Sequence, residues 1–157
     1  MLRELGAGDG GFGGTSFGRG EADLAEFLRA CADGEDAAKV APGFVPQTIY
    51  WMVDDAGDAV GMLRLRHHLN DHLLQHGGHV GYYVRPGARG KGYAKQALRM
   101  ALERLRAMGV PRALVTVDPT NAPSIRVILA NGGRADGQGR HPQTDHVVNR
   151  YWIELSV

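Results

Sequence analysis

The sequence contains little cysteine, almost no net charge and no long apolar run. Its single cysteine, Cys31, excludes an internal disulfide and suits a reducing compartment. The formal net charge is +1 at pH 7, so nucleic acid or an anionic membrane could be held only by a local basic patch. No apolar run approaches the roughly 20 residues of a membrane span, and the N-terminus lacks the charged-then-apolar order of a signal peptide. We therefore expect a cytoplasmic protein that binds neither nucleic acid nor a membrane.

The length and the distribution of glycine suggest one domain with an irregular head. A chain of 157 residues has the size of a single domain, here 1–157, with a core of ordinary size. Residues 1–20 include a glycine-rich segment whose only large apolar groups are Phe12 and Phe17. Because glycine loses the most backbone entropy on ordering, we expect the segment from Gly6 to Gly20 to be a loop or partly disordered.

Hydrophobic patterning predicts a mixed α/β fold. It predicts helices over 21–31, 94–108 and 124–131, and strands over 48–53, 59–68, 79–84, 112–117 and 147–155. The middle helix is the clearest element, because apolar residues recur at helical spacing and Gly109 and Pro111 end it. The turn "DDAGD" joins the first two strands as an antiparallel hairpin. The class is therefore mixed α/β rather than a doubly wound sheet.

A basic, glycine-rich turn opens directly into the clearest helix. The start of a helix exposes unpaired N–H groups and the positive end of the macrodipole. Gly90 and Gly92 leave room for an anion, and Arg89 and Lys91 add charge, which together predict a phosphate or pyrophosphate site. The spacing fits neither the nucleoside-triphosphate loop nor the dinucleotide fingerprint, which would require a glycine at Lys95.

A third pattern fits the turn. The stretch "RGKGYA", 89–94, resembles the Q/R-x-x-G-x-G/A signature of the GNAT N-acetyltransferase superfamily, which cradles the pyrophosphate of acetyl-CoA. A strand ending in Val-x-Pro precedes it, and "TVDPTNAPSIRVILANGG" is similar to the second cofactor segment of that superfamily. The resemblance covers about 47–133. The stretches "RHHLND" and "GGHVGYYVRP" look like a bacterial subgroup of predicted acetyltransferases.

The resemblance implies a fold, an activity and a cofactor. The fold would be a mixed, mostly antiparallel sheet flanked by helices, with the N-terminal strand missing or reduced, because none is visible ahead of the head. The activity would be transfer of an acetyl group from acetyl-CoA to an amine of a small molecule or peptide, by direct attack in a ternary complex. No metal would be required. The alternative is a non-catalytic acyl-CoA-binding module that senses the cofactor.

The same resemblance implies which residues bind the cofactor. Backbone amides of the turn would bind the pyrophosphate, the strand before it would run beside the pantetheine arm, and two residues of the second segment would contact pantetheine and the thiol end. In sequence order these residues are Tyr82, Tyr83, Val84, Arg89, Gly90, Lys91, Gly92, Tyr93, Ala94, Asn121 and Ser124.

The groups that move protons are less clear. Many members have a tyrosine that reprotonates the departing thiolate, but the matching residue here is Ile128. No carboxylate lies on the 78–84 strand, where some members keep a general base. His79 is the titratable side chain nearest that position with a suitable pKa. A structural role is the competing interpretation of His79.

Two further expectations concern the other histidines and the edge of the sheet. The four histidines His67, His68, His72 and His76 lack cysteine or carboxylate partners at ligand spacing, so we expect a solvated loop rather than a metal site. His67 could line the acceptor pocket. Without a first strand, the 48–53 strand would present unpaired backbone groups, a known route to association. We therefore expect a homodimer.

Overall fold

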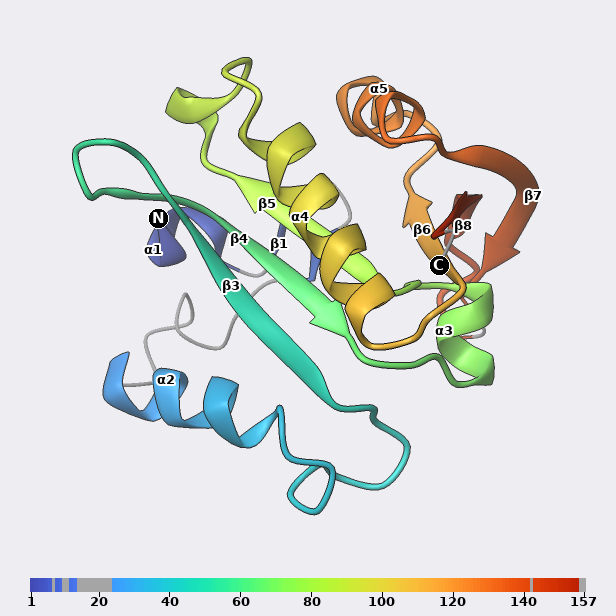
Figure 1. Cartoon of the computed structure of the whole chain (residues 1–157), viewed down its shortest axis with the longest axis horizontal. Coiled ribbons are helices and arrows are strands. Elements are labelled where there is room, and N and C mark those ends of the chain that lie inside the picture. The colour runs from blue at the N-terminus through green and yellow to red at the C-terminus, as the bar shows by residue number, and fades with distance from the viewer. Residues whose placement is uncertain (7, 10–11, 14–23, 142, 156–157) are drawn as a thin grey trace.

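A computed structural model describes residues 1–6, 8–9, 12–13, 24–141 and 143–155 of the chain. Helices and strands follow one another as shown in Figure 1. Their bounds are α1 Leu2–Leu5, β1 Gly8–Asp9, β2 Phe12–Gly13, α2 Leu24–Asp33, β3 Gln47–Val53, β4 Ala59–Arg66, α3 Asp71–Gln75, β5 Val80–Val84, α4 Tyr93–Ala107, β6 Arg112–Val117, α5 Ala122–Ala130, β7 Arg134–Arg140 and β8 Val147–Glu154. None of the helices in these ranges is both long and apolar enough to cross a membrane.

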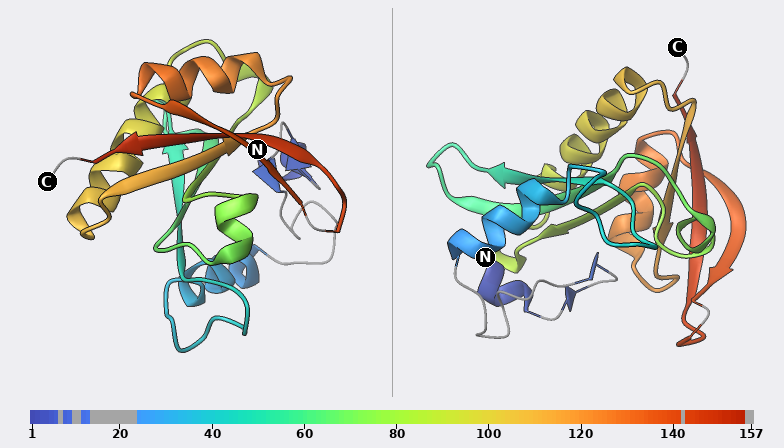
Figure 2. Two further views of the ribbon diagram at one scale, coloured as in Figure 1. Left: turned by 90° about the vertical axis from the view of Figure 1, so that its right-hand side faces the viewer. Right: turned by 90° about the horizontal axis from the view of Figure 1, so that it is seen from below.

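The main strands form two three-stranded antiparallel sheets, in the orders β3-β4-β5 and β6-β8-β7. The strands of the second sheet run across the direction of the first in both views of Figure 2. The expected hairpin is confirmed, because Asp54 donates its N–H to the carbonyl of Asp58 over 3.0 Å and Gly57 has a φ of 85°. The expected mixed, mostly antiparallel α/β class is also confirmed.

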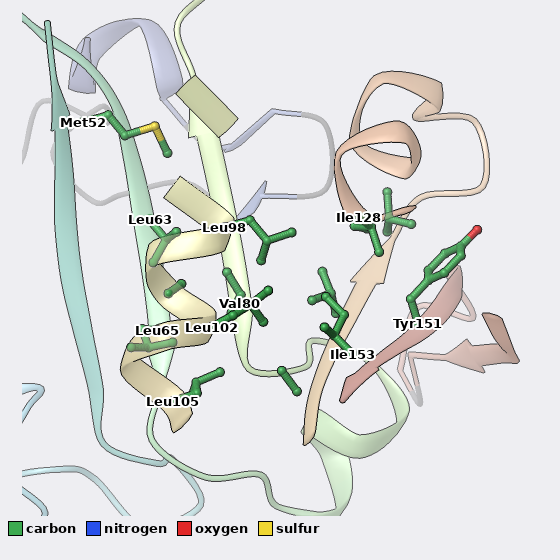
Figure 3. Close-up of a cluster of buried hydrophobic side chains, with 14 of the residues drawn as sticks. Met52, Leu63, Leu65, Val80, Leu98, Leu102, Leu105, Ile128, Tyr151 and Ile153 are labelled. Atoms are coloured by element: carbon green, nitrogen blue, oxygen red, sulfur yellow. The ribbon is translucent and has the colours of Figure 1, made fainter. Parts of the chain in front are cut away.

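Helix α4 packs over the first sheet and builds the main core. Its apolar stripe buries Leu98, Ala101, Leu102 and Leu105, and Figure 3 shows the three leucines facing β4 and β5, with side chains of the second sheet beyond them. The helix begins after Gly92, which is left-handed, and Gly109 has a φ of 79° beyond its end. Met108, expected within the stripe, is 44% exposed because it lies at this C-terminal end.

The opposite face of the first sheet is covered by the N-terminal head. Leu2, Leu5 and Phe12 are buried together with Met62 and Tyr83, and Arg85 forms a 2.9 Å ion pair with Glu4. The two leucines share one face of a helical turn that precedes the glycine-rich segment, so the expectation of a loop from Gly6 to Gly20 stays a prediction. Residues 14–20, including Phe17, lie outside the described ranges. Ahead of α2 the strands of the described residues are β1 and β2, each two residues long.

Besides the short elements of the head, the sequence did not predict α3 and β7. Asn70 caps α3 by accepting a hydrogen bond from the N–H of Leu73 over 3.0 Å. Strand β7 pairs with β8 and also contacts α3. The contact is close, because a Cβ on Gly139 would overlap the carbonyl oxygen of Gln75. Glycine at residue 139 thus lets the main chains of α3 and β7 touch.

Helix α2 confirms an expected helix, and one side chain of its apolar face packs against the first sheet. Phe27 packs edge-on against Trp51 with ring centroids 6.2 Å apart. Leu24 and Leu28, on the same face of the helix as Phe27, are 47% and 45% exposed. Only one of the three residues on this face therefore contacts the sheet closely.

Candidate functional site

The two sheets meet at one point and then part. Between β5 and β6 the paired contact is a single antiparallel bridge, Gly78 to Val115. Beside it, His79 donates its backbone N–H to the carbonyl of Leu114 over 2.7 Å, and the N–H of Leu114 donates to Nδ1 of His79 over 3.0 Å. Nδ1 of His79 therefore accepts a hydrogen bond that a backbone carbonyl would accept in a continuous β ladder. Beyond this point the facing edges of β5 and β6 diverge.

The surroundings of His79, the expected general base, bear on its role. The residue is 5% exposed, its Nδ1 is occupied by Leu114, and it is not among the side chains that line the neighbouring cavity. Burial, followed by the charges of Arg66 and His68, lowers the pKa of His79 to about 4. The catalytic role stays a prediction, and these surroundings favour the structural role that the sequence left open.

A cavity of about 320 Å³ occupies the gap between the sheets. One wall comes from Tyr82 on β5 with Ser124 and Ile128 on α5. The other wall is formed by Phe12 with Arg64 and Arg66 on the face of the first sheet that carries the head. The cavity therefore extends past the edge of β5 from one face of the first sheet toward the other.

Within the described ranges, no strand pairs with the edge of β5 that faces this gap, although Arg89 donates to the carbonyl of Val84 there. The N–H of Arg66 donates to the carbonyl of His79, and the N–H of Arg85 donates to the carbonyl of Val60. In an antiparallel pair, successive residues of a strand direct their N–H and C=O groups alternately to one neighbour and away from it. Tyr83 is an even number of residues from His79 and Arg85, so it directs its main chain to β4. Tyr82 and Val84 direct theirs to the gap. Two of the three expected main-chain contacts with pantetheine therefore face the gap, and that of Tyr83 faces β4.

The glycine-rich turn lies at the other end of β5. It begins with a 3-10 turn, Pro86–Ala88, and Gly90 and Gly92 follow with φ values of 79° and 85°. A Cβ on either glycine would meet no atom of the described residues within 4 Å. Arg89 donates from Nε to the carbonyl of Val84 over 2.9 Å, and Lys91 is exposed. Tyr93 and Ala94 form the first turn of α4, so the structure places this expected anion site at a helix start with open space above it.

The second predicted segment lies across the gap from β5. Asn121 caps α5 by accepting a hydrogen bond from the N–H of Ser124 over 3.2 Å. The carbonyl of Ser124 accepts a hydrogen bond from the hydroxyl of Tyr82 over 3.4 Å. Burial raises the pKa of Tyr82. Ile128 on α5 is buried and has no hydroxyl. The phenol beside the cavity is instead that of Tyr82 on β5.

The cavity wall is unusually cationic for a buried surface. Arg64 and Arg66 are two residues apart on β4 and therefore share one face. Burial lowers the pKa of both, that of Arg66 to about 10 with a contribution from Arg64. Arg66 donates to the carbonyls of Gly77 and Gly78 over 3.1 and 2.9 Å. Within the described ranges the Nε of Arg64 has no hydrogen-bond partner, and its guanidinium lies 5.0 Å from the centre of the Phe12 ring.

The histidines are arranged differently from the expected solvated loop. His67 bonds to the hydroxyl of Thr48 over 2.9 Å, does not line the cavity, and His68 is exposed. His72 and His76 instead meet two histidines from the β7–β8 connection, His141 and His146, at the end of the cavity. Burial, followed by the charges of these three rings, lowers the pKa of His76. This meeting could not be predicted from the sequence, because it depends on the position of β7.

Comparisons with known proteins identify the family. The acetyltransferase (GNAT) domain model matches residues 16–134, well over half of the chain. No curated protein matches. Similar solved structures include ribosomal-protein-S5-alanine acetyltransferase from Vibrio fischeri (18% identity, TM-score 0.57, covering 69% of this chain and 61% of that one) and an N-acetyltransferase from Staphylococcus aureus Mu50 (20%, 0.57, 70% and 68%). Mycobacterium smegmatis RimJ, solved in complex with CoA-disulfide, is 26% identical with a TM-score of 0.53, covering 68% of this chain and 53% of that one.

The chain thus spans less than two thirds of the length of the Vibrio fischeri and Mycobacterium smegmatis proteins. Its split sheet, its glycine-rich turn before α4 and the match over 16–134 agree with one another. The chain belongs to the GNAT acetyltransferase family.

Proposed function

We propose that this protein is an acetyl-CoA-dependent N-acetyltransferase that transfers the acetyl group directly to an amine in a ternary complex. The observation that carries the proposal is the gap between β5 and β6, which joins a cavity at the parting of two sheets. The turn before α4 would hold the pyrophosphate through its backbone amides. Pantetheine would lie along the edge of β5 that faces the gap, and the amine would enter through the cavity.

In this arrangement the main chain of β5 helps the reaction. The N–H groups of Tyr82 and Val84 face the gap by the alternation of the ladder, so one of them can donate a hydrogen bond to the thioester carbonyl as negative charge develops on its oxygen. The amine nitrogen forms a bond to the carbonyl carbon, the carbon–sulfur bond breaks, and the amine releases a proton to water or a base. Positioning and this hydrogen bond supply most of the rate enhancement.

Tyr82 is the proton donor that we propose for the departing thiolate. Its hydroxyl lines the cavity and lies 3.4 Å from the Ser124 carbonyl. A raised pKa keeps the phenol protonated at neutral pH. It would thus replace the tyrosine that the family often carries at the residue equivalent to Ile128. The acyl-transfer reaction then needs no donor from α5.

The charge of the cavity supports an acceptor that carries an anionic group. Arg64 and Arg66 contribute buried positive charge to the wall, and Asp118 is the one carboxylate among its described lining residues. A carboxylate or phosphate on the acceptor would offer the guanidinium of Arg64 a charge-assisted partner. An amino acid or an acidic peptide satisfies this requirement, whereas a polyamine does not.

A thiol-release assay with matched amines tests both parts of the proposal. Each acceptor with a carboxylate is compared with its amide, for example glutamate with its diamide. We expect kcat/KM at least about 10-fold higher for the acids, since a charge-assisted hydrogen bond contributes about 1.5–3 kcal/mol. Arg64→Gln should remove this preference, and the exposed Arg106→Gln should keep it.

The variant Tyr82→Phe tests the proposed proton donor in the same assay. We expect kcat to fall about 100-fold, at the low end for acid–base groups because a thiolate leaves without full protonation, with acetyl-CoA affinity unchanged. Binding of acetyl-CoA without thiol release for any amine would instead support the alternative, a non-catalytic module that senses the cofactor. Unchanged kcat in Tyr82→Phe would contradict the role of the phenol alone.

A further inference from the structure

Three histidines from distant parts of the chain converge at one end of the cavity. His72 and His76 are four residues apart at α3, so both project from the same side of the helix. His141 follows β7 directly, and β7 packs against α3. The centre of the His141 ring lies 5.2 Å from that of His72 and 5.0 Å from that of His76. One ring nitrogen from each of the three lies within 4.8 Å of the other two.

This spacing suits a small cation with imidazole ligands. A tetrahedral Zn²⁺ with bonds of about 2.0–2.1 Å holds its ligand nitrogens about 3.3 Å apart, so side-chain movements of about 1 Å would close the cluster. Neutral imidazole is the preferred donor for Zn²⁺, Cu²⁺ and Ni²⁺, whereas Mg²⁺ and Ca²⁺ require oxygen donors. The three-histidine set therefore selects transition metals.

A fourth histidine and a carboxylate orient the cluster from outside. Nε2 of His146 lies 3.0 Å from the carboxylate of Asp118, and its Nδ1 lies 3.1 Å from Nε2 of His76. With Asp118 accepting from His146, Nδ1 of His146 accepts from Nε2–H of His76. That arrangement leaves the lone pair of His76 on Nδ1. Chains of this kind, from carboxylate through imidazole, commonly fix the tautomer of a metal ligand.

Binding of a cation by His141 would break two hydrogen bonds that its ring accepts. Its Nδ1 accepts hydrogen bonds from the N–H groups of Gln143 and Thr144 over 3.3 and 3.2 Å. Both bonds are longer than the usual 2.9–3.0 Å or so. Coordination through Nε2 requires the tautomer protonated at Nδ1, so these two weak bonds are the interactions given up.

We propose that His72, His76 and His141 bind one divalent transition-metal ion, with Zn²⁺ as its representative. Three protein ligands leave a coordination position that faces the cavity, as in sites that keep water or a substrate group in the fourth position. Three neutral imidazoles leave the charge of the ion uncompensated, so it adds to that of Arg64 and Arg66. The site would tie α3 to the β7–β8 connection. The expected absence of a metal rested on His67, His68, His72 and His76 alone, without His141.

Calorimetry with chelator-treated protein and ZnCl₂ at pH 7.5 tests the site. We expect one equivalent per chain, and Co²⁺ should give the visible absorption of a tetrahedral complex. His72→Ala and His141→Ala should each weaken binding at least 100-fold, while His68→Ala, an exposed histidine nearby, should bind as wild type. Asp118→Asn should keep one equivalent and weaken binding about 10- to 100-fold.

Thermal unfolding separates loss of the site from loss of the fold. In chelator, both variants should melt close to wild type, and only wild type and His68→Ala should gain melting temperature when Zn²⁺ is added. Equal binding by wild type, His72→Ala and His141→Ala, or several equivalents that no single variant reduces, would mean adventitious binding to surface histidines and overturn the proposal. No saturable binding would also overturn it.

Discussion

Replacing Gly92 with alanine should weaken acetyl-CoA binding while leaving the fold largely intact. Gly92 has a φ of 85° and its added Cβ would meet no atom of the described residues within 4 Å. The substitution therefore costs backbone strain but no clash, roughly 1–2 kcal/mol. For a chain of this size that corresponds to a fall in Tm of about 2–8 °C. The methyl group would instead enter the space that we assign to the pyrophosphate.

Gly109 provides a matched control at the other end of α4. It has a φ of 79° and the same open surroundings, so Gly109→Ala should lose a similar amount of stability. Each lost hydrogen bond from an amide to a phosphate oxygen costs about 1.5–3 kcal/mol, or about 10- to 100-fold in Kd. We expect that loss for Gly92→Ala and none for Gly109→Ala. Lys91→Ala should cost less, because an exposed cation contributes little.

Isothermal titration of acetyl-CoA into the three variants measures the difference, with melting curves recorded in parallel. If Gly92→Ala binds acetyl-CoA as tightly as Gly109→Ala does, the turn does not hold the pyrophosphate. A matched fall in stability without a change in Kd at Gly92 would mean that its conformation serves only the start of the helix.

Two further predictions concern the parting of the sheets and the outer edge of the first one. The pKa of His79 is about 4 in the folded protein and 6.5 for an unperturbed histidine. The unfolded state therefore binds more protons between these values, and stability falls by roughly 3 kcal/mol as pH drops from 6.5 toward 4. His79→Asn keeps an acceptor for Leu114 but does not titrate, so denaturant titrations should show this pH dependence in wild type only, and equal slopes would contradict the buried neutral ring. β3 is an edge strand of its sheet, and we predict a homodimer, so light scattering at tens of micromolar should give about twice 16.9 kDa; a monomeric mass would exclude it.

Local signals in the sequence predicted much of the fold. The stripe of α4, the β3–β4 hairpin and the buried β6 each depend on residues close together in the chain, so periodicity and turn chemistry sufficed. β7 was missed because it reads "RADGQGR", which has little β-branched or aromatic content and is held by pairing with β8. α3 was missed because five residues carry too little periodicity to identify a helix.

The candidate site was likewise predictable only where it depends on residues close together in the chain. The turn at Gly90 and Gly92 was predictable, since glycine, charge and a helix start lie within a few residues. The cationic wall and the histidine cluster were not, because Arg64, His76 and His141 become neighbours only through the packing of separate elements. The environment of His79 was equally hidden, since it depends on the Leu114 N–H across the gap.

The main-chain contact between Gly139 and Gln75 has a consequence for any ligand of the histidine cluster. Contacts between backbones do not depend on rotamers, so α3 and the end of β7 are held in register before anything binds. The conformational entropy of bringing these segments together is then lost during folding. Ligand binding therefore has to restrict only the rotamers of the imidazole side chains. The size of residue 139, which has no side chain to bind a ligand, therefore affects how tightly this end of the cavity can bind.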